Sequence, residues 1–547
     1  MTIQRLVLAI LLSAFGAAPA WAQVASPPEV IGTLAGPGST PVQPNLGFFG
    51  TDLGWTVEHK GELRILFGDT DAAFNSVCFP MPFNDDSQGT LPLLRPDGVP
   101  PLTMQSEPGE PDVLQRLIVT RKGESLQMGY GQVPVSAYSD GRNLVGIIGR
   151  GGTIPCTAGV SSPVAACRGP LSDHPSLLNW LSADGLRCSK TVGECVPALN
   201  NIPTACELAT GAGCNPLLGE TCQPTPDGLC VDPSSSQNNG TPASERFTMG
   251  NEMEFAVEDP NNPGRYESMA TLRTNKFINT ASRTVRRFTF LPFANDYKPG
   301  SGALLVWGRP LWDGEQGRQS QLYLLAHPLP IRKAENGRWR FQPWFYAGVD
   351  KHTGLPLWSQ QQGNAKPLAL DGVVGGSPFE EQPLVNQLSI SWVGGTIRKW
   401  VMLYAGNIGD FYLADPANAR PGEGPGSIRI RFADHPWGPW SPAQPHLLEG
   451  SPSEVGSLLG PGGYMFHPLC LDQPGAPCAR SDEVRPIDFY VGCFPIGKTF
   501  DNGFLYAPNI IDSYTEPDGT GGMNLYWNVS IWNPYAVLYL KTNLRPR

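Results

Sequence analysis

Charged residues are scarce in this chain of 547 residues, because they form 16% of it against about 25% in an average soluble domain. The balance is acidic, with 39 Lys and Arg against 49 Asp and Glu, and no basic block dominates any region. Binding to nucleic acid or to an anionic membrane surface relies on clustered positive charge, so neither is expected. A neutral polymer or a small neutral ligand is compatible with this charge.

Several enzyme motifs are also missing. The sequence has no H-E-x-x-H zinc motif and no G-x-S-x-G nucleophile elbow. Its seven His residues show no recognisable metal-binding spacing. Zinc-protease and lipase chemistry are therefore not indicated, and no organic cofactor is implied.

Long amphipathic helices are not indicated either, because no segment shows a sustained 3.6-residue apolar period. Gly (63 residues) and Pro (56 residues) are abundant instead, which favours many turns and short strands. Sets of such strands at intervals of tens of residues favour an all-β fold, either a β-propeller or a β-sandwich. The clearest β-type runs are 62–67, 303–307, 321–326, 399–404, 427–432 and 535–541.

The N-terminus has the features of a secretory signal peptide over residues 1–22. Arg5 is followed by an apolar stretch at 6–15 that is too short to span a bilayer, and an A-x-A cleavage site follows. No other stretch is apolar for long enough to span a membrane. We expect an exported, periplasmic or extracellular protein, with an exposed Pro/Gly-rich leader at 23–45 before a domain at 46–547.

Cysteine is unevenly distributed. Eight of the 12 residues lie between 156 and 230, among small polar residues with little apolar periodicity. Such a segment buries little apolar surface and needs covalent links to hold a fold. We expect a disulfide-rich insertion at 151–245 whose pairing the sequence does not choose. Zinc is the alternative, but the segment has no C-x-x-C pair.

The stretch GTDLGWTVEHKGELRILFGDT predicts two strands joined by a tight turn at Lys60–Gly61. With that two-residue loop, His59 pairs with Glu62, and Asp52 pairs with Asp69. Opposite residues on one sheet face have Cβ atoms about 5 Å apart, and like charges placed there are destabilising. Such a pair can keep one carboxyl protonated and the other ionised, which is the division that glycoside hydrolysis requires.

Simpler interpretations of the two carboxylates stay open. Asp52 can cap a turn, and Asp69 can begin a loop through an Asx turn. A register slip of one residue would put them on opposite faces of the sheet. Asp69 and Asp71 also form a weak, incomplete pattern for Ca²⁺, and no other metal is indicated.

GTDLG followed by FGDT resembles the first blade of the endo-D-arabinanase family of glycoside hydrolases, long known as a domain of unknown function. The resemblance covers about 46–547 without the Cys-rich insertion. It implies a five-bladed β-propeller, secreted hydrolysis of arabinofuranose polymers, and a catalytic pair at Asp52 and Asp69. Three further stretches fit it: KWVMLYAGN (399–407), ADHPWGPWSP (433–442) and LYWNVSIWNPYAVLYLK (525–541).

One position departs from that family. Its members often carry Glu before a Leu-Ser or Phe-Ser step in a middle blade, where this chain has Gln387. An amide does not titrate, so Gln387 cannot serve as an acid or a base. An altered substrate or a binding-only protein therefore stays open. Asp313 and Glu315 are candidate substitutes, although exposed loop acids are the simpler interpretation.

Sugar sites combine flat apolar faces with bidentate polar groups. We expect Trp307, Arg309 and Arg318, which lie in and after one strand, to bind a polysaccharide or oligosaccharide with Gln387 and Tyr506. Trp and Tyr in propellers more often fill the core between blades.

The sequence thus predicts an all-β, five-bladed β-propeller with a disulfide-rich insertion and a site at one mouth of its channel. A competing hypothesis is an interaction protein that uses the insertion as its contact surface. The oligomeric state is not indicated.

Overall fold

The computed structural model describes the chain in segments. In this part of the chain the regular structure is β-strands with two short 3-10 helices, η5 (Gln362–Asn364) and η8 (Asp512–Tyr514), and no α-helix. The all-β prediction is therefore confirmed for the described residues. These are 23–36, 39, 50–71, 86–121, 124–127, 132–155, 187–189, 192–196, 205–207, 221–224, 229–231, 246–274, 276–286, 288–290, 302–309, 322–333, 339–370, 385–405, 427–448, 450, 455, 457–458, 463–465, 505–531 and 536–546.

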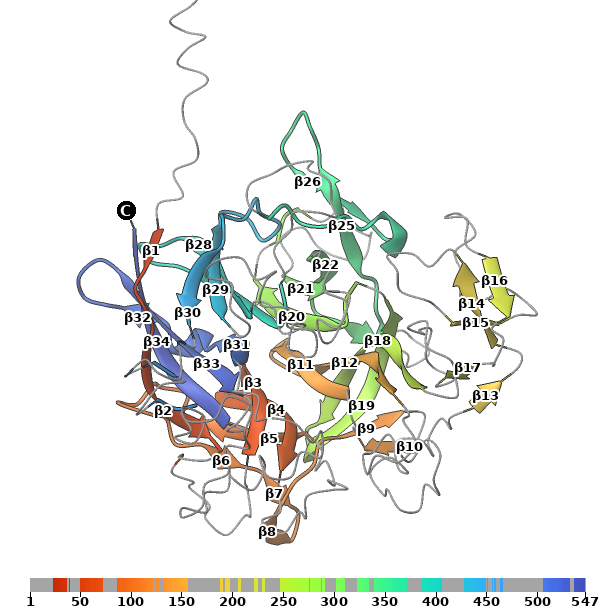
Figure 1. The fold of residues 1–547 in the computed structure, drawn as a ribbon, viewed down its shortest axis with the longest axis horizontal. Helices are drawn as coiled ribbons and strands as arrows, with labels where there is room; N and C mark the ends of the chain where they lie inside the picture. Colours follow the sequence, from red (N-terminus) through yellow and green to blue (C-terminus); the bar gives the residue numbers. More distant parts are fainter. Residues whose placement is uncertain are drawn as a thin grey trace, which may run out of the picture.

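Most strands belong to five sheets of four or more strands (Figure 1). The first sheet has β3 (Gly50–His59), β4 (Glu62–Asp71), β5 (Ser87–Leu91) and β6 (Thr103–Met104). The second is built on β9 (Ile118–Arg121), β10 (Glu124–Gln127), β11 (Gln132–Ser139), β12 (Leu144–Pro155), β18 (Arg246–Asp259) and β19 (Asn262–Arg273). The third has β20 (Asn279–Val285), β21 (Ala303–Arg309), β22 (Tyr323–Pro328), β25 (Trp344–Val349) and β26 (Pro356–Ser359).

The last two sheets contain the C-terminal strands. The fourth has β27 (Leu388–Val393), β28 (Lys399–Ala405), β29 (Ile428–Ala433) and β30 (Gln444–Leu447). The fifth has β31 (Leu505–Ile510), β32 (Glu516–Pro517), β33 (Met523–Ile531) and β34 (Ala536–Pro546) with β1 (Gln23–Ala25) and β2 (Glu29–Ala35). All six runs expected to be strands are confirmed, as β4, β21, β22, β28, β29 and β34.

One strand of each sheet contributes to a ring. β3 contacts β11, β11 contacts β20, β20 contacts β27, β27 contacts β31, and β31 returns to β3. Figure 1 shows β31, β3, β11 and β20 near the centre of the view, with further strands of their sheets outside them. The five strands therefore surround a common channel.

Where two neighbouring strands of the ring touch, later residues of one strand contact later residues of the other. Between β3 and β31, Asp52 meets Tyr506 and, further along, Thr56 meets Asn509. Neighbours in the ring thus run parallel, so their beginnings gather at one end of the channel. The same order holds for Trp55–Ala137 and His59–Ser139, for Ser136–Thr280 and Ala137–Ser282, and for Ser389–Ile510 and Ser391–Asp512.

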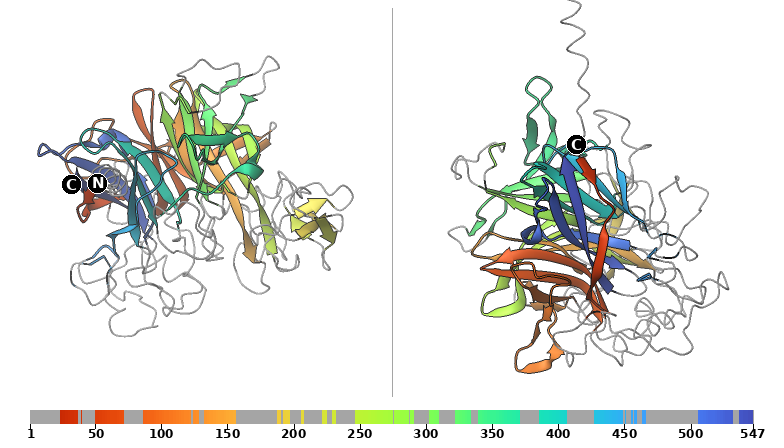
Figure 2. Two further views of the ribbon diagram at one scale, coloured as in Figure 1. Left: turned by 90° about the horizontal axis from the view of Figure 1, so that it is seen from above. Right: turned by 90° about the vertical axis from the view of Figure 1, so that its left-hand side faces the viewer.

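The fifth sheet joins the two ends of the described chain (Figure 2). β2 pairs antiparallel with β34, from Glu29 opposite Lys541 to Ala35 opposite Val537. This corrects the prediction of an exposed leader at 23–45 for its described strands. Pro, Gly and Ser dominate the composition of that range, but its EVIGTLA run has a strand's β-branched and apolar residues, and its last three residues are buried.

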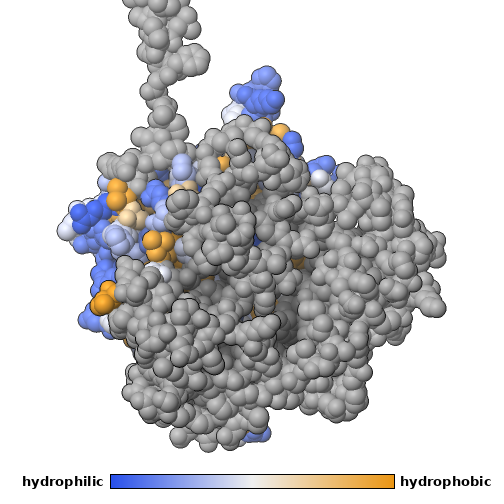
Figure 3. Space-filling model, viewed as in Figure 1, coloured by the Kyte–Doolittle hydropathy of each residue, from blue (hydrophilic) through white to orange (hydrophobic). Residues whose placement is uncertain are grey.

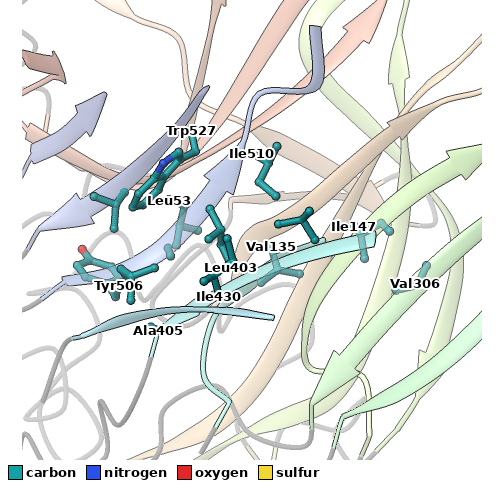
Figure 4. Close-up of a cluster of buried hydrophobic side chains, with 14 of the residues drawn as sticks. Leu53, Val135, Ile147, Val306, Leu403, Ala405, Ile430, Tyr506, Ile510 and Trp527 are labelled. Carbon is teal, nitrogen blue, oxygen red and sulfur yellow. The ribbon is translucent and has the colours of Figure 1, made fainter. Parts of the chain in front are cut away.

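Apolar side chains between the sheets and inside the ring form the core (Figure 4). β21 and β22 are buried along their whole length, which explains why their continuous apolar runs were readable in the sequence. On the face shown in Figure 3, the coloured surface is mostly hydrophilic with separate hydrophobic spots. Isolated apolar side chains of this kind are ordinary on protein surfaces.

The Cys-rich segment lies between β12 and β18, which are hydrogen-bonded neighbours. A chain that leaves one strand and returns on the next strand of the sheet has the connectivity of an insertion. Backbone register places Cys188 opposite Cys230, and Cys195 opposite Cys222. The disulfides stay a prediction, and these two pairings are the ones that the register favours.

Arg283, on β20, lies in the ring and contacts three of its other strands. Its guanidinium lies 4.8 Å from the ring centroid of Trp55. Nη2 donates to Ser389 Oγ (3.4 Å) and to the carbonyl of Ile510 (3.2 Å), while Nε lies 2.9 Å from an oxygen of Asp512. A planar group with five donors is suited to link several strands at once.

We expect Arg283→Met to lower the free energy of unfolding by about 2–4 kcal/mol, because several hydrogen bonds and the contact with Trp55 are lost together. Arg283→Lys keeps the charge without the planar fork, so it recovers part of the loss. Urea denaturation measures both. Arg545→Met is the control, because the Arg545 side chain is 63% exposed and its loss should change stability by less than about 0.5 kcal/mol. Equal effects at the two positions would contradict the role of Arg283.

His327, on β22, gives a pH-dependent prediction. The ring is buried, Nδ1 donates to the carbonyl of Pro328 (2.6 Å), and Nε2 accepts from the Gln342 N–H (2.9 Å). Burial lowers the pKa of His327 from 6.5 to about 4, against weaker opposing effects of backbone hydrogen bonds. As the pH falls, His327 is therefore protonated in the unfolded chain before it is protonated in the folded protein. The free energy of unfolding falls between about pH 6.5 and 4 by up to about 1.4 kcal/mol per pH unit.

We expect His327→Phe to flatten this pH dependence, measured by urea denaturation between pH 7.5 and pH 4.5. His435→Phe is the matched control, because His435 is exposed and stacks on Trp437, a contact that Phe preserves. An unchanged slope in His327→Phe would show that other groups cause the acid sensitivity.

Candidate functional site

The hairpin of β3 and β4 was predicted closely. Lys60 and Gly61 form its turn with φ of 50° and 84°, and His59 pairs with Glu62 as expected. At the open end Thr51 pairs with Thr70, but the register is irregular between Thr51 and Trp55. Asp52 lies in this irregular part. The backbone of Asp69 belongs to β4, and the carboxylate pairing with Asp52 stays a prediction.

The Asp52 carboxylate is held from two sides. The Tyr506 hydroxyl donates to its Oδ2 at 3.0 Å, across 454 residues of sequence. On the other side Asp52 lies against the backbone of Gly68, where an added Cβ would meet Oδ1 at 2.2 Å. Glycine is therefore needed at 68 for the carboxylate to take this position beside β4. The predicted binding of a sugar by Tyr506 stays a prediction.

The backbone next to this contact is in an unusual conformation. Leu53 has φ of 65° and Ala507 has φ of 47°, although neither is glycine. Both residues lie where the register of their strands shifts. Left-handed backbone at ordinary residues is unfavourable and persists where the surroundings enforce it, commonly at functional sites.

Leu53 and Ala507 line a pocket inside the ring. Its cavity volume is about 20 Å³, which is room for one or two groups of the size of a water molecule and not for a sugar ring. All five ring strands or their ends contribute to it. The lining residues are Leu53, Trp55, Val135, Asn279, Gln387, Leu388, Ala507, Pro508 and Asn509.

The other predicted binding residues are only partly brought together. Gln387 lines the pocket, and Arg309 contacts Asn386, the residue before it. Trp307 instead has no exposed surface, donates from Nε1 to the carbonyl of Pro436 (2.8 Å) and packs against Trp400 in the core. It offers no face to a sugar, so we do not retain it in the site.

Some predicted residues lie outside the described part of the chain. These are Arg318, Asp313, Glu315 and the signal peptide. The same holds for 492–499, GCFPIGKT, which matches the P-loop spacing and was not singled out above. A phosphate-binding assignment requires a preceding strand and a following helix, so the match alone carries none.

Asn279 and Asn509 are site residues that the sequence did not reveal. Asn279 is paired with Arg309 across β20 and β21, and Asn509 lies in the strand that begins with Leu505 and Tyr506. Asn279 is the first residue of its strand, which is a usable signal, whereas Asn509 is the fifth of the six residues of β31 and gives no such signal.

Within the described residues, no cluster of three or more His, Cys, Asp and Glu could hold a metal ion. No helix there has the length and apolar character needed to cross a membrane.

No family model matches the chain, and no curated protein does. Solved structures show similarity at low identity. An exo-beta-1,3-galactanase from Phanerochaete chrysosporium with beta-1,3-galactotriose is 8% identical with a TM-score of 0.32, and the match covers 94% of this chain but 64% of that one. A GH62 hydrolase in complex with xylotriose is 9% identical with a TM-score of 0.23, covering 96% and 97%.

A Trypanosoma rangeli sialidase mutant displaying trans-sialidase activity is also similar, at 9% identity and a TM-score of 0.26 over 96% and 58% of the two chains. The chain thus spans less than two thirds of the galactanase and of the sialidase. With TM-scores this low, the function proposed below rests on the residues of the site.

We expect Gly68→Ala to displace the Asp52 carboxylate, because the new Cβ and Oδ1 cannot both keep their positions. The loss of stability should be about 1–3 kcal/mol, measured by urea denaturation. Gly363→Ala is the control, because a Cβ there meets nothing within 4 Å. Equal stability of the two variants would show that the Asp52 side chain moves freely.

Proposed function

We propose that the five sheets are the blades of a five-bladed β-propeller and that the protein is a secreted glycoside hydrolase. Its substrate would be a furanosidic, arabinan-type polysaccharide, and its catalytic carboxylates would be Asp52 and Asp69. The closed ring of parallel strands and the joining of β2 to β34 support the propeller.

The observation that carries the enzymatic proposal is the position of Asp52. Its carboxylate is oriented by Tyr506 and lies against β4 at Gly68, one residue before Asp69. Asp52 and Asp69 thus belong to neighbouring strands at the same end of the first sheet, and Asp52 adjoins the pocket through Leu53.

In the proposed reaction one carboxylic acid protonates the leaving oxygen of the glycosidic bond. The other carboxylate activates water or attacks the anomeric carbon. The Tyr506 hydroxyl fixes the orientation of Asp52 for either role. Export through the segment at 1–22 would bring the enzyme to a polymer that lies outside the cytoplasm.

Carbohydrate binding without catalysis is the second candidate function, and the pocket favours it. None of its nine lining residues titrates. Apart from the backbone and the indole nitrogen of Trp55, its polar atoms come from Gln387 and two Asn side chains. Neutral carboxamides suit hydroxyl groups of a neutral sugar without supplying an acid or a base.

We expect the mature protein to release fragments from either D-arabinan or L-arabinan, followed by chromatography. Asp52→Asn and Asp69→Asn should each lower the rate by at least about 10²-fold, because an amide performs neither acid–base nor nucleophilic chemistry. Asp97→Asn, at an exposed position, should leave the rate unchanged.

Calorimetric titration with the same polymers separates the two functions. Binding without fragments, retained in both Asp variants, would favour the binding protein and contradict the hydrolase. Fragments that persist in Asp52→Asn and Asp69→Asn would place the catalytic residues elsewhere.

A further inference from the structure

Three carboxamide side chains from three different sheets line the pocket, and each has one polar atom without a hydrogen-bond partner. The atoms are Asn279 Nδ2, Gln387 Oε1 and Asn509 Nδ2. All three residues are deeply buried, at 2%, 8% and 2% exposure. Buried polar atoms without partners are rare in folded proteins and call for an occupant that satisfies them.

The orientation of the Asn509 amide follows from its other contacts. Asn509 Oδ1 accepts from the backbone N–H of Thr56 (3.1 Å) and from its hydroxyl (3.0 Å), so the NH₂ group is the one left for the pocket. The Gln387 backbone is already satisfied, through Asn386 Oδ1 and the N–H of Ala405. Its side-chain oxygen is buried and has no partner.

Together the three atoms offer two donors and one acceptor. An alcohol hydroxyl has one hydrogen to donate and two lone pairs that accept, so this set matches a single hydroxyl group. A carboxylate only accepts hydrogen bonds, so it would be repelled by the oxygen of Gln387. An ammonium group only donates, so it would be repelled by the two NH₂ groups. The pocket is therefore selective for a neutral hydroxyl.

The remaining walls are apolar. The polar atoms are surrounded by Leu53, Val135, Leu388, Ala507 and Pro508, and the small volume restricts the occupant to one or two heavy atoms. A hydroxymethyl group has this character, because its carbon is apolar and its oxygen carries one hydroxyl.

The pocket adjoins the proposed catalytic carboxylate. Leu53 follows Asp52 in β3, and Ala507 follows Tyr506 in β31, so the pocket lies one residue beyond the Asp52–Tyr506 contact on both strands. A sugar that placed an arm in the pocket would keep its ring beside Asp52.

We propose that this pocket receives the primary hydroxymethyl arm of a furanoside and thereby positions the ring at Asp52. The inference rests on the proposed function for the identity of the sugar. A buried water has the same hydrogen-bonding chemistry, and the experiment below separates the two occupants.

The test is a binding cycle that combines one protein change with one ligand change. Wild type and Gln387→Met are titrated calorimetrically with the methyl arabinofuranosides of the D and L series and with their 5-deoxy analogues. Met keeps the length of the side chain and removes its acceptor. Gln360→Met, at an exposed position, is the matched control.

Removing the 5-hydroxyl should weaken binding of one series about tenfold in wild type and in Gln360→Met. In Gln387→Met the same removal should change the affinity little. An equal loss in wild type and Gln387→Met would mean that a water occupies the pocket and would overturn the inference. Absence of binding of all four glycosides would overturn it as well. These titrations need no hydrolysis, so failure of arabinan cleavage is a separate result.

Discussion

The pairing of β2 with β34 is the constraint on which the rest of the structure depends. It ties the beginning of the described chain to its end, through a ladder from Glu29 to Ala35 and an ion pair of Glu29 with Lys541 at 3.2 Å. The chain continues from β2 in the fifth sheet to β3 in the first sheet, so this ladder links the last sheet to the first. Once the ladder has formed, Asp52 near the start of the chain can meet Tyr506 near its end.

The sequence predicted best those strands that lie in the middle of a sheet. β21, β22 and β28 are buried along nearly their whole length, so they read as apolar runs. β29 is buried as well, and it was recognised although Arg429 and Arg431 alternate with its apolar residues. The ring strands β11, β20, β27 and β31 were not singled out, because Ser, Thr and Asn interrupt them. Those polar groups are satisfied across sheets, as Ser136 is by Thr280, and such partners are invisible in a single sequence.

The parts of the site that are formed by residues near one another in the sequence could be predicted. The parts that are formed by residues far apart in the sequence could not. The hairpin turn at Lys60–Gly61 fixes the register from His59–Glu62 to Trp55–Leu66, and it follows from residues close together in the chain. Asn279 and Asn509 become neighbours in one pocket only after the ring has closed. Trp307 misled for a related reason, since an indole that fills space between sheets looks in sequence like one that faces a sugar.

The pocket and the contacts of Arg283 carry opposite kinds of polar chemistry and are adjacent, because Trp55 lines the pocket and also contacts Arg283. Near the beginnings of the ring strands lie Asp52, Asn279 and Gln387, with unpartnered amide atoms and left-handed backbone at Leu53, all of which oppose folding. Further along those strands, Arg283 joins three of its neighbours through Trp55, Ser389 and Asp512. Because these contacts lie on the same strands as the pocket, they hold the pocket residues in place. A pocket built to bind a hydroxyl can therefore keep its polar atoms open without the ring coming apart.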